Sequence, residues 1–183
     1  MGQDARIRYT QMVIKQNFIE LLKKQPLNRI TVKKICELAG INRATFYKYY
    51  ADPFDLLEKM EQEMIEELRQ YVGKREQKGI QKALIMILEK IKSDSELYMA
   101  VASENGDDRF PARIFEICYQ YVAMDIRRQF PQLSNTQQEW LYYYMAQGCS
   151  GILNCWIRGG MKEPAGSVAE FAEKLLRNSL ENL

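Results

Sequence analysis

The chain has 183 residues, of which 46% are hydrophobic and 27% are charged, a balance that is typical of a globular protein and excludes general disorder. It contains no histidine, which excludes Ser-His-Asp and Cys-His nucleophilic centres, HExxH zinc sites and haem ligation by imidazole. With only 10 glycines and 5 prolines, the chain lacks the frequent turn residues of a long β-sandwich, so a mostly helical fold is favoured.

Positive charge is concentrated at the N-terminal end of the chain. Residues 1–52 carry ten Lys and Arg against four Asp and Glu, a net charge of +6, whereas the remaining residues carry a net charge of −4. This asymmetry indicates that the N-terminal part binds a polyanion. A solvated basic surface without a ligand is the alternative, and charge alone does not decide between the two.

The four cysteines, Cys36, Cys118, Cys149 and Cys155, form no CxxC pair, and no hydrophobic secretory segment follows Met1. We therefore expect a cytoplasmic protein in which each cysteine is a small buried apolar residue. A redox pair of Cys149 and Cys155 is the alternative, although a spacing of six residues does not place them on the same side of adjacent helical turns.

Apolar periodicity and capping residues predict four helices in the N-terminal part of the chain. The first covers about 8–24, with Ile14, Phe18, Leu21 and Leu22 on one stripe. Thr31 and Asn42 are the expected N-caps of helices at 32–39 and 43–50, with Gly40 ending the former. The fourth helix begins with Asp52 as N-cap and Pro53 as its first residue, and it continues to about Val72.

No strand-like alternation competes with helical periodicity in the rest of the chain, so the fold is predicted to be all-α. The expected later helices cover 79–92, 95–104, 111–129, 136–158 and 167–181. Capping boxes are predicted at Ser93-x-x-Glu96, Ser134-x-x-Gln137 and Ser167-x-x-Glu170.

Two short helices separated by Gly40 and Ile41 have the arrangement of a helix-turn-helix. Ile35 and Ala39 are expected to pack inward, and Phe46 is expected to anchor the second helix. This leaves five residues near the exposed N-terminal half of that helix, where a recognition helix contacts bases and phosphates: Arg43, Ala44, Thr45, Tyr47 and Lys48. An ordinary corner between two helices with a polar face is the alternative.

The run from Thr31 through Ala39-Gly-Ile, Arg43-Ala-Thr-Phe-Tyr47 and Tyr49-Tyr50 resembles the DNA-binding domain of TetR-family transcriptional regulators. Tyr49 stands where the family usually has histidine and can still donate a hydrogen bond to a phosphate. Pro53 stands where the family often has lysine, and Lys48 is the candidate to compensate. The candidate DNA-contacting residues are Thr31, Lys33, Arg43, Ala44, Thr45, Tyr47, Lys48 and Tyr49.

The resemblance implies a DNA-binding domain at 1–52 and a helical domain at 53–183 that dimerises and often binds a small effector. The segment from Tyr142 through Ala146, Gly148, Gly151 and Trp156 to Gly160-Met-Lys-Glu-Pro164 is similar to a subgroup associated with dihydroxyacetone kinase operons. The expected function is a homodimeric repressor that binds a pseudo-palindromic operator on double-stranded DNA and is released by a small molecule of unknown identity.

From Trp140 to Ile157 there are 18 residues without a charge. A membrane span is rejected because Gln147, Ser150 and Asn154 are polar, three tyrosines are consecutive, and no basic flank marks a cytoplasmic side. We expect this helix and the apolar stripe of 167–181 to form a four-helix interface between two subunits. Burial of both helices in the core of a monomer is the alternative.

Aromatic and methionine side chains of the C-terminal part are candidates to line an effector pocket, although a helical core and a dimer face account for most of them. They are Tyr98, Phe110, Phe115, Tyr119, Tyr121, Met124, Trp140, Tyr142, Tyr143, Tyr144 and Met145. The polar residues that could orient a ligand are Glu116, Gln120, Gln147 and Asn154.

A co-regulator that binds a protein instead of a metabolite is the second hypothesis. An enzyme is disfavoured because the sequence has no histidine, glycine-rich phosphate loop or metal-ligand spacing, and no cofactor or metal is expected.

Overall fold

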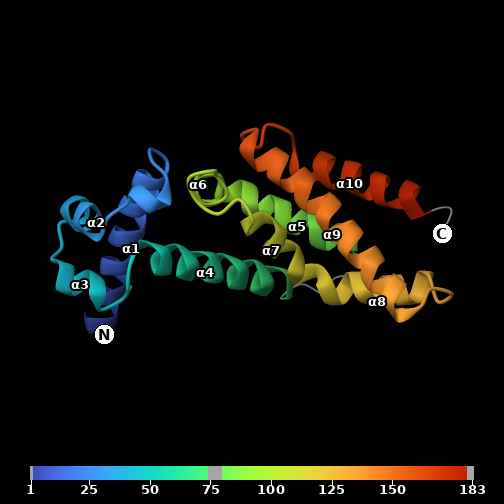
Figure 1. Cartoon of the computed structure of the whole chain (residues 1–183), viewed down its shortest axis with the longest axis horizontal. Helices are drawn as coiled ribbons and strands as arrows, with labels where there is room; N and C mark the ends of the chain where they lie inside the picture. Colours follow the sequence, from blue (N-terminus) through green and yellow to red (C-terminus); the bar gives the residue numbers. More distant parts are fainter. Residues whose placement is uncertain (1, 74–79, 181–183) are drawn as a thin grey trace. The chain divides into compact units, whose positions relative to one another are not determined.

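The protein is described by a computed structural model that covers residues 2–73 and 80–180. All regular elements in these two ranges are helices, which confirms the predicted all-α class (Figure 1). The α-helices are α1 (Gly2–Leu22), α2 (Val32–Ala39), α3 (Arg43–Tyr47), α4 (Pro53–Gly73), α5 (Ile80–Ser93), α6 (Ser95–Val101), α7 (Phe110–Phe115), α8 (Tyr119–Gln129), α9 (Asn135–Arg158) and α10 (Ala165–Leu180). Two 3-10 helices, η1 (Leu27–Arg29) and η2 (Glu116–Cys118), complete the set. The expected first residue of the helix from 79 and the last residue of the helix to 181 lie outside the described ranges.

The described chain divides into two compact units. The first comprises Met1–Met64 and Ala100–Asp108, and the second comprises Ile65–Met99 and Arg109–Leu183. Residues 100–108 belong to the first unit because Asn105 accepts a hydrogen bond from the Leu27 N–H at 2.9 Å and donates one to the Leu22 carbonyl at 3.0 Å. The boundary predicted after residue 52 divides the chain into a DNA-binding part and a part that dimerises and binds an effector, and it stays a prediction.

The first unit has a core built from α1 to α4. The largest fully buried side chains that these helices contribute are Ile14, Phe18, Leu22, Ile35, Phe46 and Leu56. The predicted stripe of α1 is therefore buried, as are Leu57, Met60 and Met64 along α4. Every one of these helices contributes at least one of these side chains. The short helices α2 and α3 are therefore stabilised by tertiary packing, since helices of their length are not stable alone.

The second unit is a helical body in which α10 packs on α5 and α9, while α7 and α8 pack on α9 (Figure 1). The predicted helix 111–129 is divided into α7, η2 and α8, because the N–H of Glu116 donates to the carbonyl of Arg113, three residues back, instead of four. The predicted helix 95–104 ends at Val101.

One of the three predicted capping boxes forms. Ser134 accepts from the Gln137 N–H at 3.2 Å, and the Gln137 side chain accepts from the Ser134 N–H at 2.9 Å. Ser93 is instead the last residue of α5, and its hydroxyl donates to the Lys90 carbonyl at 2.7 Å. Ser167 lies inside α10, which begins at Ala165, so the other two predicted boxes are wrong.

Candidate nucleic-acid interface

The turn between α2 and α3 has the geometry predicted for a helix-turn-helix. Gly40 adopts φ 62° and ψ 34°, and the N–H groups of Gly40 and Ile41 both donate to the Cys36 carbonyl. Asn42 then starts α3 by accepting a hydrogen bond from the Thr45 N–H at 2.8 Å. Thr31 caps α2 in the same way by accepting from the Lys34 N–H at 3.3 Å. Local hydrogen bonds therefore fix both ends of the turn.

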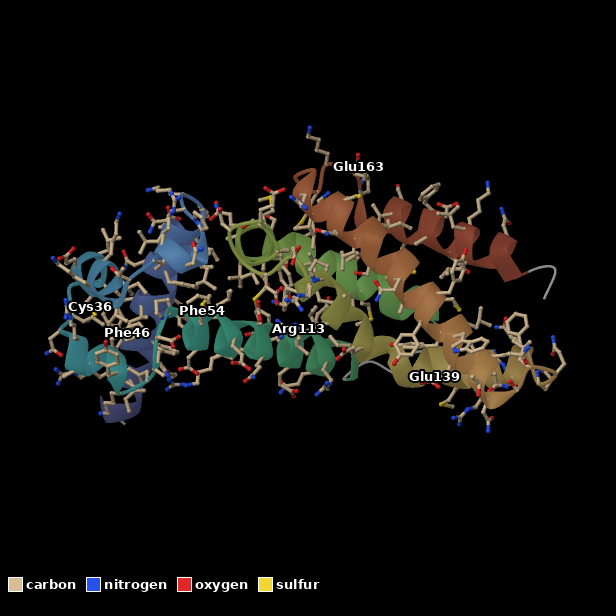
Figure 2. All side chains as sticks on the ribbon, viewed as in Figure 1. Cys36, Phe46, Phe54, Arg113, Glu139 and Glu163 are labelled. Carbon is tan, nitrogen blue, oxygen red and sulfur yellow. The ribbon has the colours of Figure 1, made fainter. Side chains whose placement is uncertain are left out.

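Phe46 determines which side of α3 faces outward. Phe46, which is labelled in Figure 2, is completely buried in the first unit. Its ring lies 5.6 Å from the Tyr50 ring, centroid to centroid. With Phe46 inward, helical geometry turns Arg43, Ala44 and Tyr47 toward the solvent. All three are exposed, and Tyr47 is 56% exposed although it is a large aromatic residue. An exposed tyrosine beside basic residues is well suited to bind a phosphate backbone.

The other candidate contact residues are also accessible, but several already have a partner. Lys48 is exposed, with its ammonium 5.9 Å from the centroid of the half-buried Tyr49 ring. The Thr45 hydroxyl donates to Asn42 Oδ1 at 3.0 Å, so its methyl group and lone pairs remain for a base edge. Lys33 pairs with Glu37 at 3.8 Å, and since both side chains are exposed, a phosphate can replace this weak partner.

The start of α4 has no lysine for a phosphate contact, because Pro53 stands at the position where the family often has one. Asp52 Oδ1 accepts from the N–H groups of Phe54 and Asp55 at 2.8 and 2.9 Å, which confirms Asp52 as the N-cap. Pro53 is buried as the first residue of the helix and offers no cation. Beside it, the Phe54 side chain is 56% exposed, an apolar residue at the candidate interface that the sequence analysis did not single out (Figure 2).

The Asp55–Lys59 pair was also missed. Lys59 Nζ donates to the Tyr49 carbonyl at 3.0 Å and to Asp55 Oδ2 at 2.9 Å. The Lys59 hydrogen bond and a second one from the Ala51 N–H hold the pKa of the Asp55 carboxyl below its ordinary range. The spacing of four residues on one helix was the available signal, but the contact with Tyr49 spans ten residues and has no sequence signature.

An uncharged face of the second unit runs along α9. Helical geometry places Trp140, Tyr144, Gln147, Gly148, Gly151 and Cys155 on one side of this helix. We call these six residues the α9 face, and all six are exposed, Trp140 and Tyr144 by 66% and 60%. Beside this face is a groove of about 640 Å³, lined by Tyr143, Tyr144, Gln147, Gly148, Cys149, Ile152, Ala172, Leu175 and Leu176. An exposed apolar area of this kind marks an interaction surface.

The C-terminal part of the chain matches a known family of proteins. The family model TetR_C_8, described as a transcriptional regulator C-terminal region, matches residues 78–178, more than half of the chain. This protein belongs to the TetR family of transcriptional regulators. The family is one of regulators, which agrees with the expectation that the chain is not an enzyme.

One curated relative and two solved structures are also similar to this chain. The uncharacterized HTH-type transcriptional regulator YxbF of Bacillus subtilis (strain 168) is 34% identical over 61 residues, 33% of this chain but only 15% of YxbF. A TetR regulator from Streptococcus agalactiae 2603V superposes with a TM-score of 0.72 at 21% identity, covering 96% of this chain and 98% of that one. The dihydroxyacetone kinase operon activator DhaS superposes with a TM-score of 0.63 at 20% identity, covering 95% and 97%. At these identities the two structures show a shared fold alone.

The candidate effector residues of this TetR-family regulator separate into core and surface. Tyr98, Phe110, Tyr142 and Met145 are buried, whereas Met124, Trp140, Tyr143 and Tyr144 are exposed. Burial raises the pKa of Tyr98 far above its usual range, so this hydroxyl stays neutral. The side chains of Phe115, Tyr119, Gln120 and Tyr121 lie outside the described part of the structure.

Glu116 and Gln147 are exposed, while Asn154 is half-buried. Its Oδ1 is buried and has no hydrogen-bond partner in the described part of the chain. Within residues 2–73 and 80–180, no helix is long and apolar enough to cross a membrane, and no three acidic or cysteine side chains gather as a metal site.

Proposed function

We propose that this TetR-family regulator is a homodimeric repressor that binds a pseudo-palindromic operator through two copies of α3. The observation that carries the proposal is the capped recognition helix, with Phe46 buried behind it and Arg43, Ala44 and Tyr47 turned outward. Two half-sites one helical turn apart, about 34–36 Å, would receive the two helices. The residues proposed to contact DNA are Thr31, Lys33, Arg43, Ala44, Thr45, Tyr47, Lys48 and Tyr49.

The α9 face supports the dimer. A helix side that carries large exposed aromatics and no charge is costly to leave in water, and a two-fold axis would cover it with its own copy. Phe171 and Leu175 of α10, which are 57% and 44% exposed, extend the apolar surface. The second unit would therefore supply two helices from each subunit to a four-helix interface.

Release by a small molecule is the third element of the proposal. The groups that favour a ligand there are the aromatic residues of the second unit and the buried Asn154 Oδ1, which has no hydrogen-bond partner among the described residues. The effector would act by binding more tightly to a dimer whose recognition helices no longer fit the operator. The first experiment is a gel shift with DNA from upstream of this protein's own gene, followed by a metabolite panel. Failure of every metabolite would favour the co-regulator hypothesis.

We also assign the C-terminal domain to the subgroup associated with dihydroxyacetone kinase operons, on the sequence similarity of 142–164 and the fold shared with DhaS. DhaS is named as an activator, so the sign of regulation needs its own measurement. A reporter fused to the bound promoter should rise when the regulator is deleted. A fall would replace the repressor by an activator and leave the DNA-binding proposal intact.

DNA affinity is expected to fall steeply with salt because residues 1–52 carry a net charge of +6. If the dimer neutralises about six phosphates, affinity should fall about a thousandfold between 50 and 200 mM salt. Fluorescence anisotropy with a labelled operator measures this slope. A flat salt dependence would contradict the placement of the DNA-binding part.

Single substitutions on α3 should separate phosphate contacts from base contacts. Lys48→Ala and Tyr47→Phe are expected to weaken binding to operator and random DNA alike, because phosphates carry no sequence information. Arg43→Ala and Thr45→Ala should reduce discrimination instead, by about 1–3 kcal/mol for a lost bidentate arginine contact. Competition between the two DNAs measures the difference, and full operator preference in Arg43→Ala would contradict its role.

A further inference from the structure

One lysine of α4 ties the end of the recognition helix to α4. Lys59 Nζ lies 3.0 Å from the carbonyl of Tyr49, two residues after the end of α3, and 2.9 Å from Asp55 Oδ2. Asp55 Oδ2 in turn accepts from the Ala51 N–H at 2.8 Å. Residues 49 and 51, on either side of Tyr50, are thus both bonded to the first two turns of α4, inside the first unit.

Tyr50 fills the space between these bonds. Its side chain is 3% exposed, and its ring centroid lies 5.6 Å from Lys59 Nζ and 5.6 Å from the centroid of Phe46. Burial raises the pKa of Tyr50 to about 12, so the residue stays neutral. A continuous set of contacts therefore leads from Lys59 through Tyr50 to Phe46, the residue that fixes the rotation of α3.

We infer that the Asp55–Lys59 pair orients the recognition helix, and that Lys59 is a positioning residue for operator discrimination. The inference rests on the proposed function, because it assumes that α3 reads the operator. Lys59 and Asp55 are 45% and 27% exposed, so their ion pair contributes little to folding stability. Base readout depends more strongly on precise geometry than folding stability does, since functional groups must be held within about 0.5 Å of their productive positions. Loss of the pair should consequently change specificity much more than stability.

A direct phosphate contact by Lys59 is the competing explanation, and Asp55 separates the two. If Lys59 binds a phosphate, Asp55→Asn removes a negative charge near DNA and should leave operator binding unchanged or tighter. If the pair orients α3, the same substitution removes the ionic partner of Lys59 and should weaken operator binding. The two explanations therefore predict different operator affinities for one conservative change.

The experiment measures affinities for operator and random DNA by fluorescence anisotropy with the full-length protein. Lys59→Met and Asp55→Asn are each expected to lose about fivefold on the operator and little on random DNA, a cost close to that of one exposed charged hydrogen bond. The double variant should lose less than the product of the two single losses, because the Asp55–Lys59 bond is removed in both single variants. Lys59→Arg keeps the charge and the donors, and it should restore operator affinity to within about twofold.

Lys23→Met is the matched control. It removes the same charge from the first unit, but Lys23, the residue that directly follows α1, pairs with Glu20 of α1 at 2.8 Å. Its effect should be equal on the two DNAs. Hydrogen exchange at the Ala51 N–H gives a readout that needs no DNA, and it should be faster in Asp55→Asn than in wild type.

The outcomes distinguish this inference from the proposed function. Equal losses on operator and random DNA in Lys59→Met, or wild-type operator binding by Asp55→Asn, would overturn the positioning role alone. A wild-type protein that does not prefer any operator over random DNA would instead overturn the proposed function. Midpoints of thermal unfolding within a few degrees of wild type establish that the variants compared are folded.

Discussion

Replacing Gly151 by arginine is expected to convert the proposed dimer into a monomer and to lower operator affinity about a hundredfold or more. Gly151 lies in the middle of the α9 face, and a Cβ added there meets no atom within 4 Å. An arginine at this position therefore points into solvent in a single subunit, and it replaces a glycine that is unfavourable within a helix. The folded subunit should be at least as stable as the wild-type subunit.

The cost of the substitution arises only between subunits. A two-fold interface would bring both new guanidinium groups into an apolar contact without a partner, and an uncompensated buried charge costs about 3–5 kcal/mol. Operator affinity falls with dimerisation because two half-sites are then bound independently, which forfeits the gain of about 10²–10⁴ that linkage provides. Residues 1–52 remain unchanged, so binding to a single half-site should be preserved.

Gly166→Arg is the matched control for this prediction. Gly166 is also a helical glycine with no atom within 4 Å of an added Cβ, but it lies near the start of α10 and outside the α9 face. Sedimentation at micromolar concentration should give a dimer for wild type and Gly166→Arg, and a monomer for Gly151→Arg. A wild-type mass near 21.5 kDa would contradict both the interface and the model of two half-sites.

The N-terminal helices could be predicted from sequence because their ends are decided locally. Thr31, Asn42 and Asp52 each cap a helix through a hydrogen bond that spans two or three residues. Gly40 ends α2 through bonds to Cys36. Interactions of this length depend on residue type and spacing, which are what a sequence displays.

The boundaries that failed depend on contacts between distant residues. Ser167 satisfies the capping-box pattern, yet α10 begins two residues earlier. The chain before α10 is held at the Glu163 carbonyl, which accepts from Trp156 Nε1 at 3.1 Å and from Lys92 Nζ at 2.9 Å. Lys92 lies on α5, 71 residues away, so no local pattern could reveal this constraint.

In the candidate site too, the features decided by nearby residues could be predicted and those decided by distant contacts could not. Burial of Phe46 follows from its position in α3 and allowed the outward residues to be predicted, whereas the Lys59 contact with Tyr49 depends on how α4 folds back on α3. In the second unit, the sequence identified an uncharged helix from Trp140 to Ile157 but did not show which of its residues are buried and which are exposed. The structure places Leu153, Trp156 and Ile157 in the core and leaves Trp140 and Tyr144 exposed, since only the position of neighbouring helices decides which side is covered.

Replacing Gly40 by valine is expected to lower operator affinity strongly, while the second unit stays folded and the proposed dimer is kept. Gly40 has a φ of 62°, a left-handed conformation that costs an L-residue about 1–2 kcal/mol and a β-branched residue more. The strain is relieved when the backbone leaves this region, but Ile41 and Asn42 then change direction, and with them the start of α3. Because both subunits carry the substitution, the combined cost is about 2–4 kcal/mol, enough to reduce operator affinity about 30- to 1000-fold.

Gly40→Asn shows whether this effect comes from backbone conformation or from side-chain volume. A Cβ at residue 40 meets no atom within 4 Å, so the site has space for either side chain. Asparagine is several-fold enriched in left-handed conformations among non-glycine residues, and we expect this variant to bind operator within a few-fold of wild type. Gel shifts with both variants, together with sedimentation to verify the dimer, make the comparison. Equal loss in the two variants would assign the effect to the side chain, and normal binding by Gly40→Val would show that this turn does not orient the recognition helix.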